Sequence, residues 1–301
     1  IAKMIKKILG LNFLLNEREL ISPPKLEDVG LIIWLTPILI FLRFFIEKQM
    51  IEFAKFLIMK NDPDYKKKHP EKYDEKIHKF GEIGTKNIFH FVVSIWAFIS
   101  FSSEDWWFGT AVQLLEKQNS CGFGIKFFYI FQLAYHCHSL LAHFWEKKRD
   151  DRLEMLIHHL VTVAVVFLSY YYRFILIGVV IFYLHDISDV FGACCKAANY
   201  VQFHLVILLS LYITLLVTWF YYRIYLFSGI IYGIYEQVHN QGVSQSIALI
   251  ACNLCLTTLQ CLHVYWWYLM VLIGVRLKSL SSSNKLSNDS EYDVTEHKKQ
   301  D

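Results

Sequence analysis

The sequence is short of charged residues. Lysine, arginine, aspartate and glutamate make up 19% of its 301 residues, whereas a soluble domain usually carries about 25%. These charges crowd into short segments and leave long apolar windows between them, and 55% of the chain is hydrophobic. The pattern excludes an ordinary water-soluble domain and is typical of a protein that crosses the membrane several times.

The sequence also lacks the ligand patterns of common metal sites. Cys252 and Cys255 have the CxxC spacing, but no second pair follows them, and structural zinc needs about four ligands. The stretch before His158 and His159 holds no histidine at the offset that a membrane di-iron oxidase requires. We therefore predict no metal and no cofactor. The cysteines of the apolar windows are interpreted as small packing residues and not as a disulfide framework.

Two further absences narrow the function. The net charge of +3 is too small to indicate nucleic-acid binding. No internal repeat is visible, and such a repeat would favour a proton-coupled transporter. The composition and the lack of a repeat therefore disfavour both a nucleic-acid-binding protein and a proton-coupled transporter.

The apolar windows predict an all-α fold, a polytopic membrane helical bundle of about seven transmembrane helices. A helix needs about 20 mostly apolar residues to cross the bilayer core. The first window is interrupted by Pro37 and Arg43, and the second is short. The windows are Val29–Phe45, Asn87–Phe101, Phe123–Phe144, Met155–Tyr172, Phe174–Ala198, Phe203–Phe227 and Ile247–Val275.

Basic residues indicate which side of the membrane each loop faces. The loop after the first window holds Lys66, Lys67 and Lys68, and the loop after the third window is also basic. The positive-inside rule places these loops in the cytosol. With seven spans the N-terminus is lumenal and the C-terminus is cytosolic. The pair Lys298-Lys299 resembles a dilysine retrieval signal, which predicts a multi-pass protein of the endoplasmic reticulum membrane.

Two polar clusters interrupt the apolar windows. His158-His159 lies near the start of the fourth window, and Thr162 follows one turn later. The stretch His185–Asp189 lies inside the fifth window and contains two aspartates and a serine. A charged group at mid-membrane costs about 2.5–3.5 kcal/mol on insertion scales, so these residues need a reason to be there.

Helix geometry predicts that the two clusters lie at one depth. The turn between the windows falls around Arg173. The histidines His158 and His159 precede it by about 14 residues, or about 21 Å of helix. Asp186 and Asp189 follow it by about 13 to 16 residues, or about 20–24 Å. Two antiparallel helices therefore build one polar layer, in the cytosolic half of the membrane.

An acid–imidazole layer suits proton transfer, because carboxylates can orient and charge a histidine. A proton or ion pathway is the competing functional interpretation. Satisfied packing is the structural interpretation of the histidine pair alone. Five other histidines of the windows stand outside the two clusters and are interpreted as satisfied bundle or interfacial residues. They are His136, His138, His143, His204 and His263.

The stretch Lys148–Tyr200 resembles the signature region of the ceramide synthases, in the TRAM–LAG1–CLN8 (TLC) domain family. The matching residues keep the family's spacing, and Thr218 to Arg223 is similar to the family's next span. The matches are Arg149-Asp150-Asp151, Glu154-Met155, His158-His159, Thr162, Ser169-Tyr170, His185-Asp186-Ile187-Ser188-Asp189, Lys196 and Asn199-Tyr200.

This resemblance implies acyl transfer from acyl-CoA to the amine of a sphingoid base such as sphinganine, giving a (dihydro)ceramide and CoA. Such an acyltransferase uses acyl-CoA as co-substrate. His158 or His159 would accept the amine proton, or one of them would attack the thioester and carry the acyl group. Asp186 and Asp189 would orient and charge these histidines. The supporting residues would be His185, Thr162 and Ser188.

The phosphates of CoA need positive charge near water. A basic group lies about 6 to 12 residues before the histidines, which is one helical extension toward the cytosol. Topology marking by the same charges is the alternative. The group consists of Lys147, Lys148, Arg149 and Arg152.

The resemblance also suggests a division of the chain and leaves one alternative function. Residues 1–28 form an amphipathic lumenal segment, residues 29–79 the first transmembrane helix and a basic cytosolic loop, residues 80–275 the TLC domain, and residues 276–301 a disordered cytosolic tail. The family includes homo- and hetero-dimers. The alternative is a non-catalytic TLC-domain lipid sensor or a translocon-associated membrane protein, although such relatives generally lack the full histidine and aspartate set.

Overall fold

The structure is a computed structural model, and it describes residues 26–116, 122–146, 151–241 and 247–282. Within these ranges the chain is helical and contains no strand. The elements are η2 (Leu26–Leu31), α2 (Ile32–Asn61), α3 (Tyr65–Lys68), α4 (Pro70–Phe101), α5 (Ala111–Glu116), α6 (Phe123–Ala142), α7 (Arg152–Tyr171), α8 (Ile175–Tyr200), α9 (Leu205–Thr218), η3 (Trp219–Leu226), α10 (Phe227–Gln241) and α11 (Ile247–Ser282). The predicted all-α class is confirmed.

Six helices of the described ranges are long and apolar enough to cross a membrane. They are formed by α2, α4, α7, α8, the continuous run from α9 to α10, and α11. Helix α6 corresponds to the remaining predicted span, but Lys126, Gln132 and His136 make it less apolar. The count of six is close to the predicted count of about seven, and it identifies a multi-pass membrane protein.

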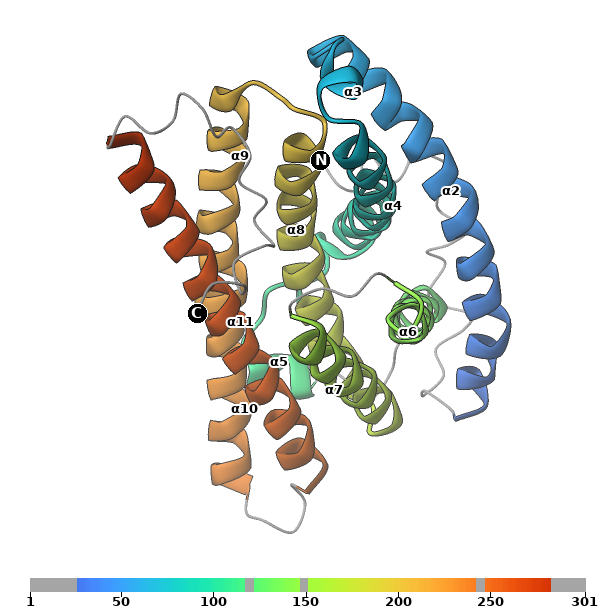
Figure 1. Cartoon of the computed structure of the whole chain (residues 1–301). Coiled ribbons are helices and arrows are strands. Elements are labelled where there is room, and N and C mark those ends of the chain that lie inside the picture. Colours follow the sequence, from blue (N-terminus) through green and yellow to red (C-terminus); the bar gives the residue numbers. More distant parts are fainter. Residues whose placement is uncertain (1–25, 117–121, 147–150, 242–246, 283–301) are drawn as a thin grey trace.

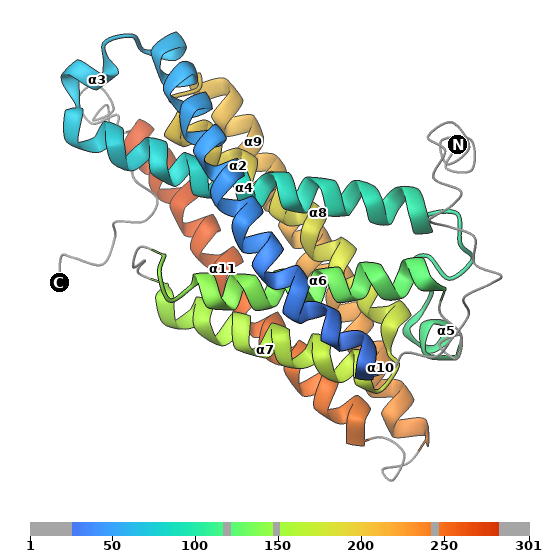
Figure 2. The same ribbon diagram turned by 90° about the vertical axis from the view of Figure 1, so that its right-hand side faces the viewer.

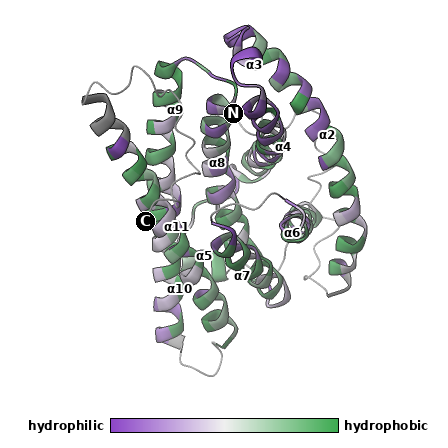
Figure 3. Cartoon of the chain, in the orientation of Figure 1, coloured by the Kyte–Doolittle hydropathy of each residue, from purple (hydrophilic) through white to green (hydrophobic). Residues whose placement is uncertain are grey.

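Helix α8 lies inside the bundle, and the other helices surround it. Figure 1 shows α2 at one side and α9, α10 and α11 at the other, with α8 between them. In the turned view, α2 crosses over α4 and α6 (Figure 2). Hydrophilic residues gather at the end of the bundle that carries α3 (Figure 3). The residues of α8 therefore have protein neighbours on several sides, which suits a helix that carries polar side chains.

Two predicted spans were too short, because the helices continue through the charged loop between them. The windows Val29–Phe45 and Asn87–Phe101 are parts of α2 and α4, which run to Asn61 and from Pro70. Lysine and glutamate are good helix formers, and pairs at i,i+4 such as Glu75 with Lys79 add support. The extended parts of α2 and α4 pack together through a separate buried apolar cluster.

A third boundary also differs from the prediction. The window Phe203–Phe227 continues to Gln241, because α9, the π-helical turn η3 and α10 form one unbroken span. A π-helical turn widens the backbone and rotates the side chains that follow it, and such turns are frequent at functional sites. Here the widened turn contains Arg223, which is 3% exposed and faces α8.

A partly buried ion-pair network joins α2, α4 and the segment that follows α6. Arg43 of α2 binds Glu146 at 2.7 Å, and Lys86 of α4 binds the same carboxylate at 3.1 Å. Burial alone would raise the pKa of the Glu146 carboxyl, but Lys86 and Arg43 oppose this and hold that pKa below its usual range. The network therefore fixes Glu146, the last described residue before residues 147–150, against α2 and α4.

Gly178 of α8 allows α6 and α8 to approach closely. A Cβ at position 178 would lie 2.6 Å from Cε2 of Tyr129, which is 1% exposed and hydrogen-bonds Ser169. Because neither ring nor backbone can move freely there, Gly178→Ala is expected to lower the free energy of unfolding by about 1–3 kcal/mol. The measurement is the thermal midpoint of the purified protein in detergent.

Gly192 on the same helix provides the matched control. A Cβ at position 192 would meet only Leu215 Cδ1, at an ordinary contact distance of 3.6 Å. Gly192→Ala should leave the thermal midpoint unchanged or raise it, since alanine is the better helix former. Equal midpoints for the two variants would contradict the close packing at Gly178.

Candidate functional site

Three histidines from three helices meet in the interior of the bundle. His263 of α11 is completely buried, and its ring centroid lies 4.8 Å from that of His185 on α8. The ring of His158 on α7 lies 6.2 Å from His263. Phe227 and Trp266 pack against this histidine cluster, defined as His158, His185 and His263. An apolar wall thus surrounds three adjacent imidazoles.

The histidine cluster contains ring nitrogens without a hydrogen-bond partner. Both nitrogens of His263, Nδ1 of His158 and Nε2 of His185 are buried and unpaired. The Nδ1 atom of His185 lies 2.7 Å from the Ile181 carbonyl oxygen. A carbonyl can only accept, so Nδ1 donates and Nε2 keeps its lone pair when the ring is neutral. Buried polar atoms are normally paired, so these nitrogens are poised to bind or exchange a proton with a ligand.

Asp186 belongs to a second group on the other side of α8. One of its carboxylate oxygens lies 2.8 Å from Nδ1 of His90 on α4, and the other accepts a 2.5 Å hydrogen bond from Gln132 on α6. Asp186 is 4% exposed. An aspartate that bonds an imidazole nitrogen fixes the ring's orientation and favours its protonated form. Asp186 therefore joins α4, α6 and α8 at the polar layer.

Asp189 has a different partner. Its carboxylate lies 2.6 Å from the guanidinium of Arg223, which also donates to the Ser188 hydroxyl at 2.6 Å and to the His185 carbonyl at 3.1 Å. The same guanidinium lies over the ring of Trp219, 4.2 Å from its centroid. Three interactions thus hold Arg223 against the stretch of α8 that carries His185, and Trp219 packs against it within η3.

The two histidines of the predicted pair point to different neighbours. The ring of His159 lies 5.8 Å from that of His143, which follows α6, whereas His158 faces the histidine cluster. Thr162, one turn beyond His158, is buried and its hydroxyl has no hydrogen-bond partner. The two histidines therefore lie on different sides of α7 and have different neighbours.

Of the predicted phosphate-binding residues, the structure describes only one. Arg152 begins α7 and is half-buried. It lies about 9 Å of helix before His158. The other predicted positions, Lys147, Lys148 and Arg149, lie outside the described residues.

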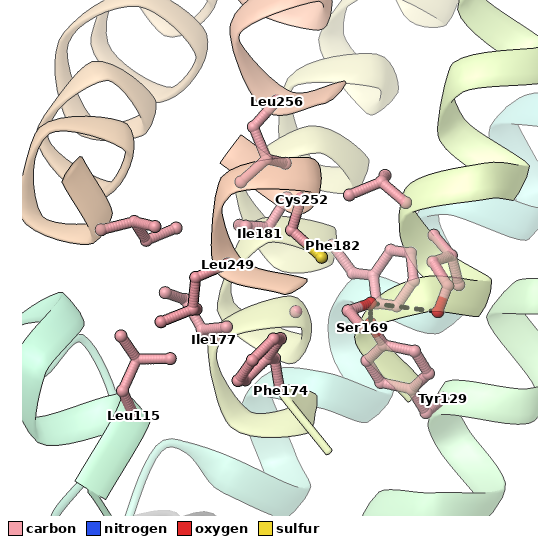
Figure 4. A pocket seen from close by; sticks show the side chains of 14 residues that line it. Leu115, Tyr129, Ser169, Phe174, Ile177, Ile181, Phe182, Leu249, Cys252 and Leu256 are labelled. Carbon is pink, nitrogen blue, oxygen red and sulfur yellow. Dashed lines mark hydrogen bonds between the residues drawn. The ribbon is translucent and has the colours of Figure 1, made fainter. Parts of the chain in front are cut away.

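An apolar cavity begins one to two turns from the histidine cluster. It lies between α5, α6, α7, α8, α10 and α11, and Figure 4 shows the side chains that line it. Val165, Ile181 and Leu256 line it from the same helices that carry the cluster, about 6–10 Å of helix closer to the α7–α8 turn. The lining of this cavity is apolar and its volume is about 40 Å³, so in this structure it has room for only a small apolar group.

The described residues contain no group of three or more histidine, cysteine, aspartate or glutamate side chains that could hold a metal ion. The histidine cluster has no carboxylate among its ring contacts, and its members face aromatic side chains. Its chemistry is therefore that of imidazole itself, which acts as a base, an acid or a nucleophile.

Sequence reasoning missed four residues of this layer. His90, Gln132 and Arg223 were not selected as site residues, and His263 was interpreted as a satisfied packing residue. The interpretation of His263 is wrong, because neither of its nitrogens has a partner. His138 was interpreted in the same way, and it too has unpaired nitrogens. A polar residue within a membrane window needs a partner or a function. This rule would have found the missed residues if it had been applied to every window.

The chain matches the model of a known protein family and several named relatives. The family model of the TLC domain, TRAM_LAG1_CLN8, matches residues 79–272. Sphingosine N-acyltransferase lac1 of Schizosaccharomyces pombe is 27% identical over 242 residues, which are 74% of this chain and 62% of that protein. Ceramide synthase 1 LOH3 of Arabidopsis thaliana is 28% identical over 271 residues, which are 82% of this chain and 84% of that protein.

A human protein is also similar. Ceramide synthase 5 of Homo sapiens is 34% identical over 173 residues, which are 57% of this chain and 43% of that protein. The chain therefore spans less than two thirds of the yeast and human relatives, and most of the plant relative. The matched residues 79–272 include every member of the histidine cluster and both aspartates.

Proposed function

Because the chain belongs to the TLC-domain family, we propose that it is a ceramide synthase, which transfers a fatty acyl group from acyl-CoA to the amine of a sphingoid base. The products are a ceramide and CoA. The observation that carries this proposal is the histidine cluster, with its unpaired nitrogens beside an apolar cavity. The names of the three relatives support the same activity.

The reaction needs a base and a site that excludes water. The amine nitrogen attacks the thioester carbonyl carbon after losing its proton to an imidazole. The bond between carbon and sulfur then breaks, and the CoA thiolate leaves and takes up a proton. Apolar and aromatic walls keep water from hydrolysing the thioester. The thioester itself drives the transfer, so we expect no further cofactor.

We assign the central role to His158, which faces the histidine cluster, and a supporting role to His159, which faces His143. His158 acts either as the general base or as a nucleophile that carries the acyl group. His185 and His263 pass protons to and from it. The unpaired hydroxyl of Thr162 lies one turn further along α7 and is positioned to bind a polar atom of a substrate.

The two aspartates have positioning roles in this proposal. Asp186 orients His90 and Gln132, and Asp189 and Ser188 hold Arg223 against α8. A positive guanidinium near the reaction centre also stabilises the negative charge that develops on the thioester oxygen. Arg152, together with Lys147, Lys148 and Arg149, would bind the phosphates of CoA.

The proposed location is the endoplasmic reticulum membrane, with the N-terminus in the lumen and the C-terminus in the cytosol, an arrangement that takes α6 as a seventh crossing besides the six. The basic loop between α2 and α4 supports this orientation. Acyl-CoA would then approach from the cytosolic side. The competing function is a non-catalytic lipid sensor, for which unpaired imidazoles beside a cavity would have no use.

The test is ceramide formation in vesicles from cells that lack their own ceramide synthases. Vesicles with the wild-type chain, sphinganine and a panel of acyl-CoAs are expected to form ceramide, and omission of either substrate should abolish it. The panel also identifies the preferred acyl length. A folded, membrane-inserted protein that forms no ceramide with any acyl-CoA would favour the lipid sensor.

A further inference from the structure

The proposed reaction releases one proton in each turnover. A sphingoid base enters as an alkylammonium, because the pKa of an alkylamine in water is about 10. Of its three N–H protons, the amide product keeps one, the CoA thiolate takes one and the third is left over. The histidine cluster can accept that proton, but Phe227 and Trp266 pack against its rings. Turnover therefore needs a second set of groups that carries the proton away.

His90 and Asp186 form a dyad that suits this task. One oxygen of the Asp186 carboxylate lies 2.8 Å from Nδ1 of His90, and the other accepts a hydrogen bond from Gln132. When the carboxylate is ionised and the imidazole is neutral, Nδ1 carries the hydrogen and Nε2 keeps its lone pair. An aspartate orients the general base of a catalytic triad in the same way. His90 is thus held ready to take up a proton at Nε2.

His136 of α6 connects this dyad with the histidines of α7 and α8. It interacts electrostatically with His90, His159 and His185, so it is within range of all three. The ring of Tyr135 lies 5.9 Å from that of His136 and 5.6 Å from that of His90. The two imidazoles therefore share a neighbour, and hydrogen-bonded water can carry a proton across a gap of this size.

On its other side the dyad leads to a charged network that reaches water. Lys86 precedes His90 by one turn of α4, about 6 Å of helix, and binds Glu82 at 2.9 Å and Glu146 at 3.1 Å. The exposed fraction of the side chain rises from 6% at Asp186 to 14% at His90 and 28% at Lys86. From Lys86 the helix continues back toward α3, where hydrophilic residues gather (Figure 3).

Charges of both signs surround His90. The aspartates attract a proton to the ring and the cations repel it, so the site can both take up a proton and release it. On α2, which packs against α4, the charged residue of this region is Arg43, held by Glu146. The other charged or titratable neighbours are Asp186 and Asp189 of α8, Arg223 of η3, Tyr135 and His136 of α6, and Lys86 of α4 itself.

We propose that His136 passes the surplus proton to Nε2 of His90, and that the dyad of His90 and Asp186 releases it to water beside Lys86 and Glu146. Only N–H and O–H bonds form and break on this path, and each imidazole returns to its neutral form. His90 is thus a relay residue that acts through its neighbours and does not touch the substrates. The inference rests on the proposed function, because the proton comes from the amine of that reaction.

The kinetic experiment compares the wild type with His90→Asn at equal amounts of folded protein. The asparagine amide can donate to Asp186 from the place of Nδ1, but it cannot take up a proton. We expect kcat to fall at least about tenfold, short of the full loss of a general base, because water still carries some protons. The KM values should stay within about twofold. An unchanged kcat would overturn the proposal.

The dependence on pH and buffer separates a relay from a structural role. The loss in His90→Asn should shrink as the pH rises, since a lower proton concentration favours release, and added imidazole should restore part of the rate. His78→Asn, at an exposed position of the same helix, is the matched control and should keep the wild-type kcat. A loss in His90→Asn that neither pH nor imidazole changes would contradict the relay.

Hydrogen–deuterium exchange at the ring carbon of histidine, measured by mass spectrometry, makes the test independent of catalysis. This rate depends on the protonation of the ring, so His90 of the wild type should show a sigmoidal dependence on pH, and Asp186→Asn should move its midpoint. If the wild type forms no ceramide but His90 titrates in this way, the proposed function fails and the relay stands. A wild-type His90 that does not respond to pH would overturn the relay, even if His90→Asn does not fold.

Discussion

Replacing His158 by alanine is expected to lower the rate of ceramide formation by roughly 10²–10⁴-fold, the usual contribution of a general base or nucleophile. The ring of His158 lies 6.2 Å from that of His263, and its buried Nδ1 has no partner in the described residues. The side chain is half-buried, so its removal should leave the protein folded. The measurement is the initial rate with saturating sphinganine and acyl-CoA, at equal amounts of membrane-inserted protein.

A labelling experiment separates the two roles of His158. Radiolabelled acyl-CoA without sphinganine should label the wild type, and not His158→Ala, if the imidazole carries the acyl group. If the wild type carries no covalent label, the result assigns His158 the role of the base. His69→Ala, at an exposed histidine in the turn before α4, is the control and should keep full activity. A loss of rate in His159→Ala but not in His158→Ala would contradict the assignment.

Arg223→Leu is expected to destabilise the protein by about 1–3 kcal/mol, because it removes three buried hydrogen-bond contacts and leaves the half-buried carboxylate of Asp189 without its counter-charge. The guanidinium is almost fully buried, and it bonds Asp189, Ser188 and the carbonyl of His185 together. Arg223→Lys should recover only part of the stability, since one ammonium cannot reproduce this planar set of donors. The thermal midpoint in detergent measures the effect.

The double variant Arg223→Leu/Asp189→Leu tests the cause of this loss. Removing both charges should cost less than the sum of the single losses, because neither charge is then left unpaired. Arg276→Leu, at an exposed position near the end of α11, is the control and should change the midpoint little. A stable Arg223→Leu protein, with a midpoint equal to that of the wild type, would show that the ion pair does not hold η3 against α8.

The sequence by itself determined the fold class, the approximate number of spans and the two polar clusters of the fourth and fifth windows. Long apolar windows leave the backbone no alternative to the helix in lipid, since every peptide group must be satisfied within its own segment. The same windows make each polar residue conspicuous. The sequence also predicted the turn between the fourth and fifth windows around Arg173. The structure confirms it, because Arg173 has a φ of 67°, a conformation that ends helices.

Only the tertiary structure decided which side chains the polar residues of each helix contact. The helical period determines which residues of one helix share a face, but the neighbour of that face depends on how all the helices pack. The sequence interpretation paired the aspartates with the histidines of α7, whereas Asp186 binds His90, 96 residues earlier, and Asp189 binds Arg223. His263 reaches the cluster from the last helix. These contacts join residues far apart in the chain, and no spacing within a single helix contains that information.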